Sequence, residues 1–66
     1  MTMDERLRVV IADDEPRARQ FLEKLLSEHE HVEVAGVAKG GGEALALIAK
    51  TKPDAAFLDI LSLIHI

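Results

Sequence analysis

Three short runs of apolar residues place the strongest limit on how this chain can fold. The runs are LRVVIA (Leu7–Ala12), VEVAGVA (Val32–Ala38) and DAAFLDI (Asp54–Ile60). The first run breaks abruptly at Asp13 and Asp14, which is typical of a strand that is buried on both faces of a sheet. The second run is rich in β-branched residues and the third is again apolar, which also favours strands. We therefore predict three strands at these positions.

The two segments between the runs carry the periodicity of amphipathic helices. The first helix begins near Pro16, because a proline in the first helical turn loses no hydrogen bond. Its apolar stripe follows the i, i+3, i+4, i+7, i+8 spacing, and we expect the large members to be core: Ala18, Phe21, Leu22, Leu25 and Leu26. After a turn at Lys39–Gly42, a second helix is predicted over Glu43–Lys50 and is closed by Pro53.

The resulting order, β-α-β-α-β with short connections, predicts parallel strands, since each return to the same edge of a sheet needs a helical crossover. The fold class is therefore doubly wound α/β. The 66 residues contain no repeat, low-complexity segment or linker, so we expect a single domain.

Composition excludes several classes of function. A formal net charge of −4 has the wrong sign for a segment that grips nucleic acid by neutralising phosphates. The chain has no cysteine, which argues against a disulfide scaffold and fits the cytoplasm. Its apolar runs fall far short of the roughly 20 residues that a membrane span needs. We expect a cytoplasmic module that contacts neither membrane nor DNA directly.

Three aspartates stand where apolar strands stop: Asp13 and Asp14 after the first run, and Asp59 near the end of the third. Open α/β sheets bind ligands at the carboxyl ends of their strands. If the first and third strands are neighbours, the three carboxylates face one another and repel unless a cation lies among them. Mg²⁺ is the natural choice, because it prefers oxygen ligands and also bridges phosphate oxygens.

A carboxylate in such a pocket can attack phosphorus and form an aspartyl phosphate. Asp59 is the better candidate for this nucleophile because it stands alone, whereas the paired Asp13 and Asp14 suit metal binding. Each residue also has a plainer explanation. Asp14 could simply cap the first helix, and a strand that ends in aspartate also occurs in P-loop nucleotide hydrolases.

Three segments together resemble the first half of the receiver domain of two-component response regulators. They are VVIADDEPRAR (Val9–Arg19), VEVAGVAKGGGEAL (Val32–Leu45) and KPDAAFLDI (Lys52–Ile60). The resemblance implies a flavodoxin-like sheet with strand order 2-1-3 and a partial receiver over residues 7–60.

The resemblance also implies roles for individual residues. Asp59 would accept the phosphoryl group from a sensor histidine kinase, and Asp13, Asp14, Asp59 and the backbone carbonyl of Leu61 would hold Mg²⁺. Such a domain is a switch that catalyses only its own phosphorylation, not an enzyme with a diffusible substrate. DDEPRAR is similar to regulators with a LytTR-type DNA-binding output, which implies transcriptional control by a full-length protein that can form a homodimer.

The chain departs from the family pattern after Ile60. Its last six residues, LSLIHI (Leu61–Ile66), are also the translation of a transposon end used to tag sequencing libraries. We expect residues 61–66 to be a non-native tail on a truncated gene fragment. Such a fragment would expose the apolar edge of its third strand, so we predict that it neither folds stably nor phosphorylates well.

Two rival functions remain. A fragment of a P-loop nucleotide hydrolase would use Asp59 to hold metal, but the chain has neither GxxxxGKS nor GxxxxGKT. A degenerate receiver used only for protein interaction is the other, and the presence of all three aspartates argues against it.

Overall fold

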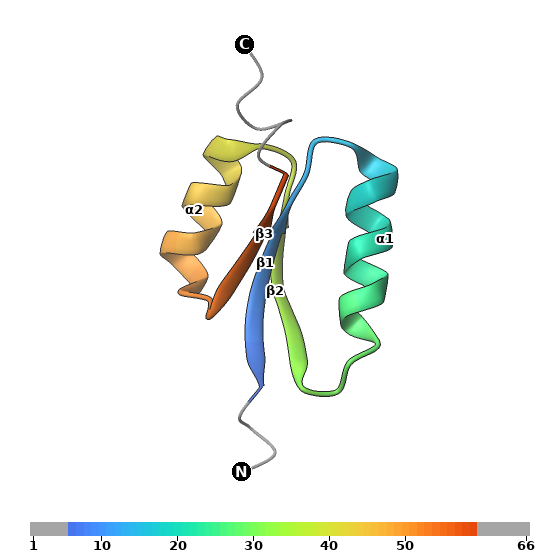
Figure 1. The fold of residues 1–66 in the computed structure, drawn as a ribbon. Helices are drawn as coiled ribbons and strands as arrows, with labels where there is room; N and C mark the ends of the chain where they lie inside the picture. Colours follow the sequence, from blue (N-terminus) through green and yellow to red (C-terminus); the bar gives the residue numbers. More distant parts are fainter. Residues whose placement is uncertain (1–5, 60–66) are drawn as a thin grey trace.

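A three-stranded parallel sheet with one helix on each face makes up the fold (Figure 1). The computed structural model describes residues 6–59. Along the chain the elements are β1 (Leu7–Ala12), α1 (Pro16–Ser27), β2 (Val32–Ala38), α2 (Gly41–Thr51) and β3 (Ala55–Leu58). The strand order is β2-β1-β3, so the predicted doubly wound α/β class and the 2-1-3 order are both confirmed.

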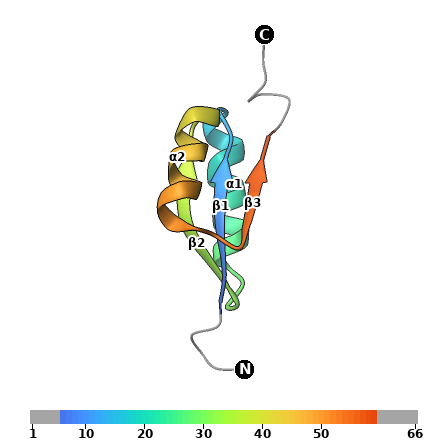
Figure 2. The ribbon, with the colours of Figure 1, turned by 90° about the vertical axis from the view of Figure 1, so that its left-hand side faces the viewer.

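The central strand β1 carries the core. It pairs in parallel with β2 on one side and with β3 on the other, as the turned view also shows (Figure 2). Helices cover both faces, and Val9, Val10, Ile11 and Ala12 are therefore almost completely inaccessible to solvent. This double burial explains why the strand is one continuous apolar run, without the alternation of a half-exposed strand.

Helix α2 packs closely against β2 at Gly36. A Cβ atom at this position would lie 3.0 Å from Cδ2 of Leu47, closer than ordinary van der Waals contact. The register between β1 and β2 also shifts here, because Val9 pairs with Val34 and Val10 with Gly36. The glycine therefore allows the close approach of α2 to the sheet.

Helix α1 corrects one expectation from the sequence. Its apolar stripe is only partly core: Leu22 and Leu26 are half-buried, whereas Phe21 is 67% exposed and Leu25 43% exposed. The apolar face of α1 is therefore wider than the part of the helix that packs against the described sheet. Phe21 and Leu25 instead line a shallow surface pocket together with Lys24 and Glu28.

Helix α2 begins two residues earlier than predicted and includes two glycines. Its first turn is held by Glu43, whose carboxylate accepts a hydrogen bond from the backbone N–H of Lys39 at 2.6 Å. The helix ends at Thr51, followed by Lys52 in the left-handed conformation (φ 49°), and so stops just before Pro53 as expected.

Strand β3 is shorter than the predicted run. Asp54 stands outside it because its carboxylate accepts the N–H of Arg8 at 2.8 Å, while its own N–H donates to the carbonyl of Arg8 at 2.7 Å. The other end of the prediction, Ile60, lies outside the described residues. Within residues 6–59, β3 pairs only with β1, and Phe57 and Leu58 are 38% and 40% exposed, which confirms the expected apolar edge.

None of the helices within residues 6–59 is long and apolar enough to cross a membrane.

Candidate metal centre

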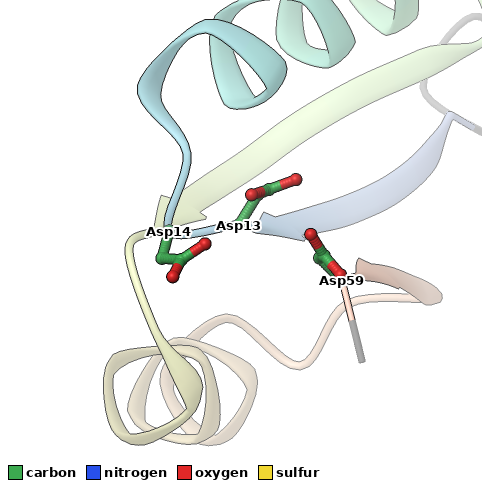
Figure 3. Close-up of side chains that lie close together, drawn as sticks. All are labelled: Asp13, Asp14 and Asp59. Atoms are coloured by element: carbon green, nitrogen blue, oxygen red, sulfur yellow. The ribbon is translucent and has the colours of Figure 1, made fainter. Parts of the chain in front are cut away.

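The three predicted aspartates lie together at the carboxyl edge of the sheet (Figure 3). One carboxylate oxygen from each of Asp13, Asp14 and Asp59 can be chosen so that all three atoms lie within 4.8 Å of one another. Asp13 and Asp59 are half-buried and Asp14 is exposed. The sequence therefore identified all three members of this cluster.

Strand register brings Asp59 beside Asp13. The last residue of β1, Ala12, pairs with Leu58 of β3, so the next residue on each strand is an aspartate. The N–H of Asp59 donates to the carbonyl of Ala12 at 3.1 Å, and the N–H of Asp13 donates to the carbonyl of Ala38 in β2 at 3.2 Å. Backbone hydrogen bonds thus hold both aspartates at the ends of paired strands.

In the loop between β1 and α1, Asp13 and Glu15 each accept a different backbone hydrogen bond. Asp13 accepts the N–H of Glu15 through Oδ1 at 2.9 Å, which turns the chain out of the sheet. The residue that caps α1 is Glu15, whose Oε1 accepts the N–H of Arg17 at 2.8 Å. The alternative in which Asp14 caps this helix is therefore wrong.

The donor set fits a small divalent cation. Mg²⁺ binds oxygen ligands at about 2.1 Å, so two oxygens on one ion lie about 3 to 4 Å apart. Separations of at most 4.8 Å come within a small side-chain rotation of that spacing. Three carboxylates held this close repel one another, and a cation among them offsets the repulsion. Leu61, whose carbonyl was predicted as a further ligand, lies outside the described residues.

Comparison with known proteins identifies the family. The family model described as response regulator receiver domain matches residues 9–61. This chain belongs to the response-regulator receiver family. The match removes the P-loop hydrolase alternative, since it runs from within β1 to beyond β3 and includes all three aspartates of the cluster.

A solved structure supports the same assignment. The signal receiver domain of NarL, a response regulator from Mycobacterium tuberculosis, is 42% identical and superposes with a TM-score of 0.80. The match covers 82% of this chain and 44% of that chain.

The relatives of this receiver include two kinds of full-length protein. A protein-glutamate methylesterase/protein-glutamine glutaminase of Anaeromyxobacter dehalogenans is 44% identical over 55 residues, which are 83% of this chain and 16% of that protein. The transcriptional regulatory protein BtsR of Escherichia coli is 39% identical over 54 residues, 82% of this chain and 23% of that protein. The chain therefore spans less than a quarter of these relatives.

Sequence reasoning missed two residues that shape the receiver site. Asp14 was the only residue considered as a cap for α1, and Glu15, which caps the helix, was given no role. Arg19 was quoted within DDEPRAR without a role, yet its Nη1 donates to the backbone carbonyl of Asp13 at 2.8 Å. A side-chain bond to a carbonyl six residues earlier leaves no periodic signal in a sequence.

Proposed function

We propose that this receiver accepts a phosphoryl group on Asp59 in a two-component phosphorelay. The observation that carries the proposal is the convergence of Asp59 with Asp13 and Asp14 within 4.8 Å at the carboxyl edge of a receiver fold. A carboxylate oxygen of Asp59 attacks phosphorus, the bond from phosphorus to the donor breaks, and an acyl phosphate remains on the protein. The receiver is a phosphoacceptor switch that catalyses only its own phosphorylation.

Asp13, Asp14 and Asp59 would hold Mg²⁺, which neutralises charge on the transferred phosphoryl oxygens. The chain's own contribution is geometric. Backbone bonds at the ends of β1 and β3 hold Asp13 and Asp59 side by side, so that the nucleophile and a metal ligand need little rearrangement when phosphate arrives. Asp14, the exposed member of the cluster, lies close to the other two aspartates (Figure 3).

The phosphoryl donor in this proposal is a sensor histidine kinase, and the relay operates in the cytoplasm. The output is transcriptional, through a DNA-binding domain encoded with this receiver. Support comes from the likeness of DDEPRAR to LytTR-type regulators and from the similarity to a transcriptional regulatory protein. A homodimer of the full-length protein is part of the same proposal. The relatives also include methylesterases. The sequence of the complete reading frame therefore tests which output domain follows this receiver.

Phosphorylation of the complete natural protein that contains this sequence tests the proposal. Incubation with acetyl phosphate and Mg²⁺ is expected to give one base-labile phosphoryl group per chain, detected by intact mass. Asp59→Asn should abolish the label, and excess EDTA should suppress it. The matched control is Asp54→Asn, the same change at the other end of β3, which should label like the wild type.

A degenerate receiver used only for protein interaction gives a different result. It would remain unlabelled with every donor and would bind Mg²⁺ no better than Asp13→Asn. Equal labelling of Asp59→Asn and the wild type would instead show that another residue is the acceptor.

A further inference from the structure

Arg19 reaches from α1 back to the loop that carries two of the three aspartates. Its Nη1 donates to the backbone carbonyl oxygen of Asp13 at 2.8 Å, a partly buried hydrogen bond between residues six positions apart. Its own backbone N–H donates to the carbonyl of Glu15 at 3.0 Å within the first helical turn. The guanidinium is therefore anchored on a regular helix and directed at the β1–α1 loop.

The bonded carbonyl belongs to the peptide group that joins Asp13 to Asp14. On the other side of Asp13, the N–H is held by the carbonyl of Ala38 in β2 at 3.2 Å. The Asp13 side chain also accepts the N–H of Glu15 at 2.9 Å. The bond from Arg19 restricts rotation of the peptide that follows Asp13, and this rotation sets the direction in which the Asp14 side chain leaves the backbone.

The same bond places a positive charge on the backbone carbonyl of Asp13, one of the three clustered aspartates. A guanidinium keeps its charge at every physiological pH, and a charge-assisted bond is stronger than a neutral one. Arg17 lies two positions away on the same helix, but it is exposed whereas Arg19 is half-buried. The two arginines therefore offer a comparison between charge alone and charge with the bond to Asp13.

We propose that Arg19 is a positioning residue that orients the Asp13–Asp14 peptide and so sets the metal affinity of the acidic cluster. The inference rests on the proposed metal-assisted function. Groups that orient metal ligands through hydrogen bonds are worth about 10- to 100-fold in metal affinity. Since Arg19 acts on a backbone carbonyl and not on a carboxylate, we expect the lower end, about tenfold.

The test measures Mn²⁺ affinity by electron paramagnetic resonance in the complete natural protein that contains this sequence. Arg19→Met removes the donor and the charge but keeps an unbranched apolar stem, and it should weaken Mn²⁺ binding about tenfold. Arg17→Met removes the same charge without touching the Asp13 carbonyl, and it should stay within about twofold of the wild type. Arg19→Lys retains a charged donor and should recover part of the loss.

Folding is followed by far-UV circular dichroism without metal, a signal that positioning alone does not change. If Arg19→Met does not fold, Arg19→Gln takes its place with the same expected loss, because its amide is too short to reach the Asp13 carbonyl. If neither variant folds, Arg19 serves the fold itself and the proposal is overturned.

The outcomes separate this inference from the function on which it rests. Failure of the wild type to bind Mn²⁺ would refute the metal site itself. Tight binding by the wild type with equal affinities for Arg19→Met and Arg17→Met would refute only the role of Arg19. A tenfold loss confined to the Arg19 variants, with partial recovery in Arg19→Lys, would support it.

Discussion

The Asp59→Asn receiver should be more stable than the wild type without metal and less stable than the wild type once Mg²⁺ is present. The reason is the crowding of negative charge at the carboxyl edge of the sheet. Ligand oxygens of Asp59, Asp13 and Asp14 lie within 4.8 Å of one another. The Asp59→Asn change removes two of the three repulsive pairs and keeps a side chain of nearly the same shape.

The magnitude follows from Coulomb's law at this separation. Two unit charges 4.8 Å apart repel by about 0.9 kcal/mol in water and about 3.5 kcal/mol at an effective dielectric constant of 20. Asp14 is exposed and Asp13 half-buried, so the lower figure is the better guide, and salt reduces it further. Loss of two pairs should therefore raise the free energy of unfolding by about 1 to 2 kcal/mol in EDTA.

Magnesium should reverse this order. A ligand at a hundred times its Kd adds about 2.7 kcal/mol to the stability of a protein that binds it only when folded. The wild type gains this amount, while Asp59→Asn has lost a charged ligand and gains much less. The two stability curves should therefore cross as the Mg²⁺ concentration rises.

Urea denaturation of the complete natural protein, read from hydrogen exchange of the β1 amides, measures the effect in this domain. Glu30→Gln is the control, because it removes one charge from the exposed loop that leads into the amino end of β2, away from the cluster, and should change stability by less than about 0.5 kcal/mol. Lower stability of Asp59→Asn in EDTA, or an equal gain from Mg²⁺ in both proteins, would refute the electrostatic reasoning.

Three further predictions concern the framework of the site and are checked by urea midpoints. Gly36→Val should lower the free energy of unfolding by about 1 to 3 kcal/mol, since its Cβ would meet Leu47 at 3.0 Å. Adding Leu47→Ala to this variant should recover part of the lost stability. Lys52→Gly should raise the free energy of unfolding by about 1 kcal/mol, because Lys52 has a φ of 49°, a left-handed conformation that glycine adopts without strain. An unchanged urea midpoint would contradict this. Arg8→Met should lower the free energy of unfolding by about 1 to 2 kcal/mol, because it removes the 2.6 Å hydrogen bond from Arg8 to the Thr51 carbonyl. Unchanged stability would show that water takes the place of the guanidinium.

Strand prediction succeeded for the two strands that pack between the helices. The predicted bounds of β1 and β2 agree with the structure, because a strand packed between two helices is apolar at most positions, even where most of its residues are only half-buried, as in β2. The third run was less well placed at its beginning. Asp54 stands outside β3 because its carboxylate bonds to Arg8, a contact between residues 46 positions apart that no local pattern contains.

Helix prediction was weaker for a related reason. Periodicity located the apolar stripe of α1 but not which part of it the sheet covers, and Phe21 and Leu25 proved exposed. In α2 the low helix propensity of glycine hid the true start at Gly41. The bond of Glu43 to the N–H of Lys39 holds that turn.

The amino-acid sequence by itself determined the kinds of elements, their order and the presence of an aspartate at the end of two strands, because burial and helical periodicity are local patterns. The tertiary structure places β3 beside β1, an order that the resemblance to receivers implied but that residue spacing left open, and it thereby brings Asp59 to Asp13 and Asp14. It also decided that Glu15 caps α1 and that Arg19 bonds to the Asp13 carbonyl. These are contacts between groups whose distances depend on strand order and on how a helix lies over its sheet, and neither quantity is written in the spacing of residues along the chain.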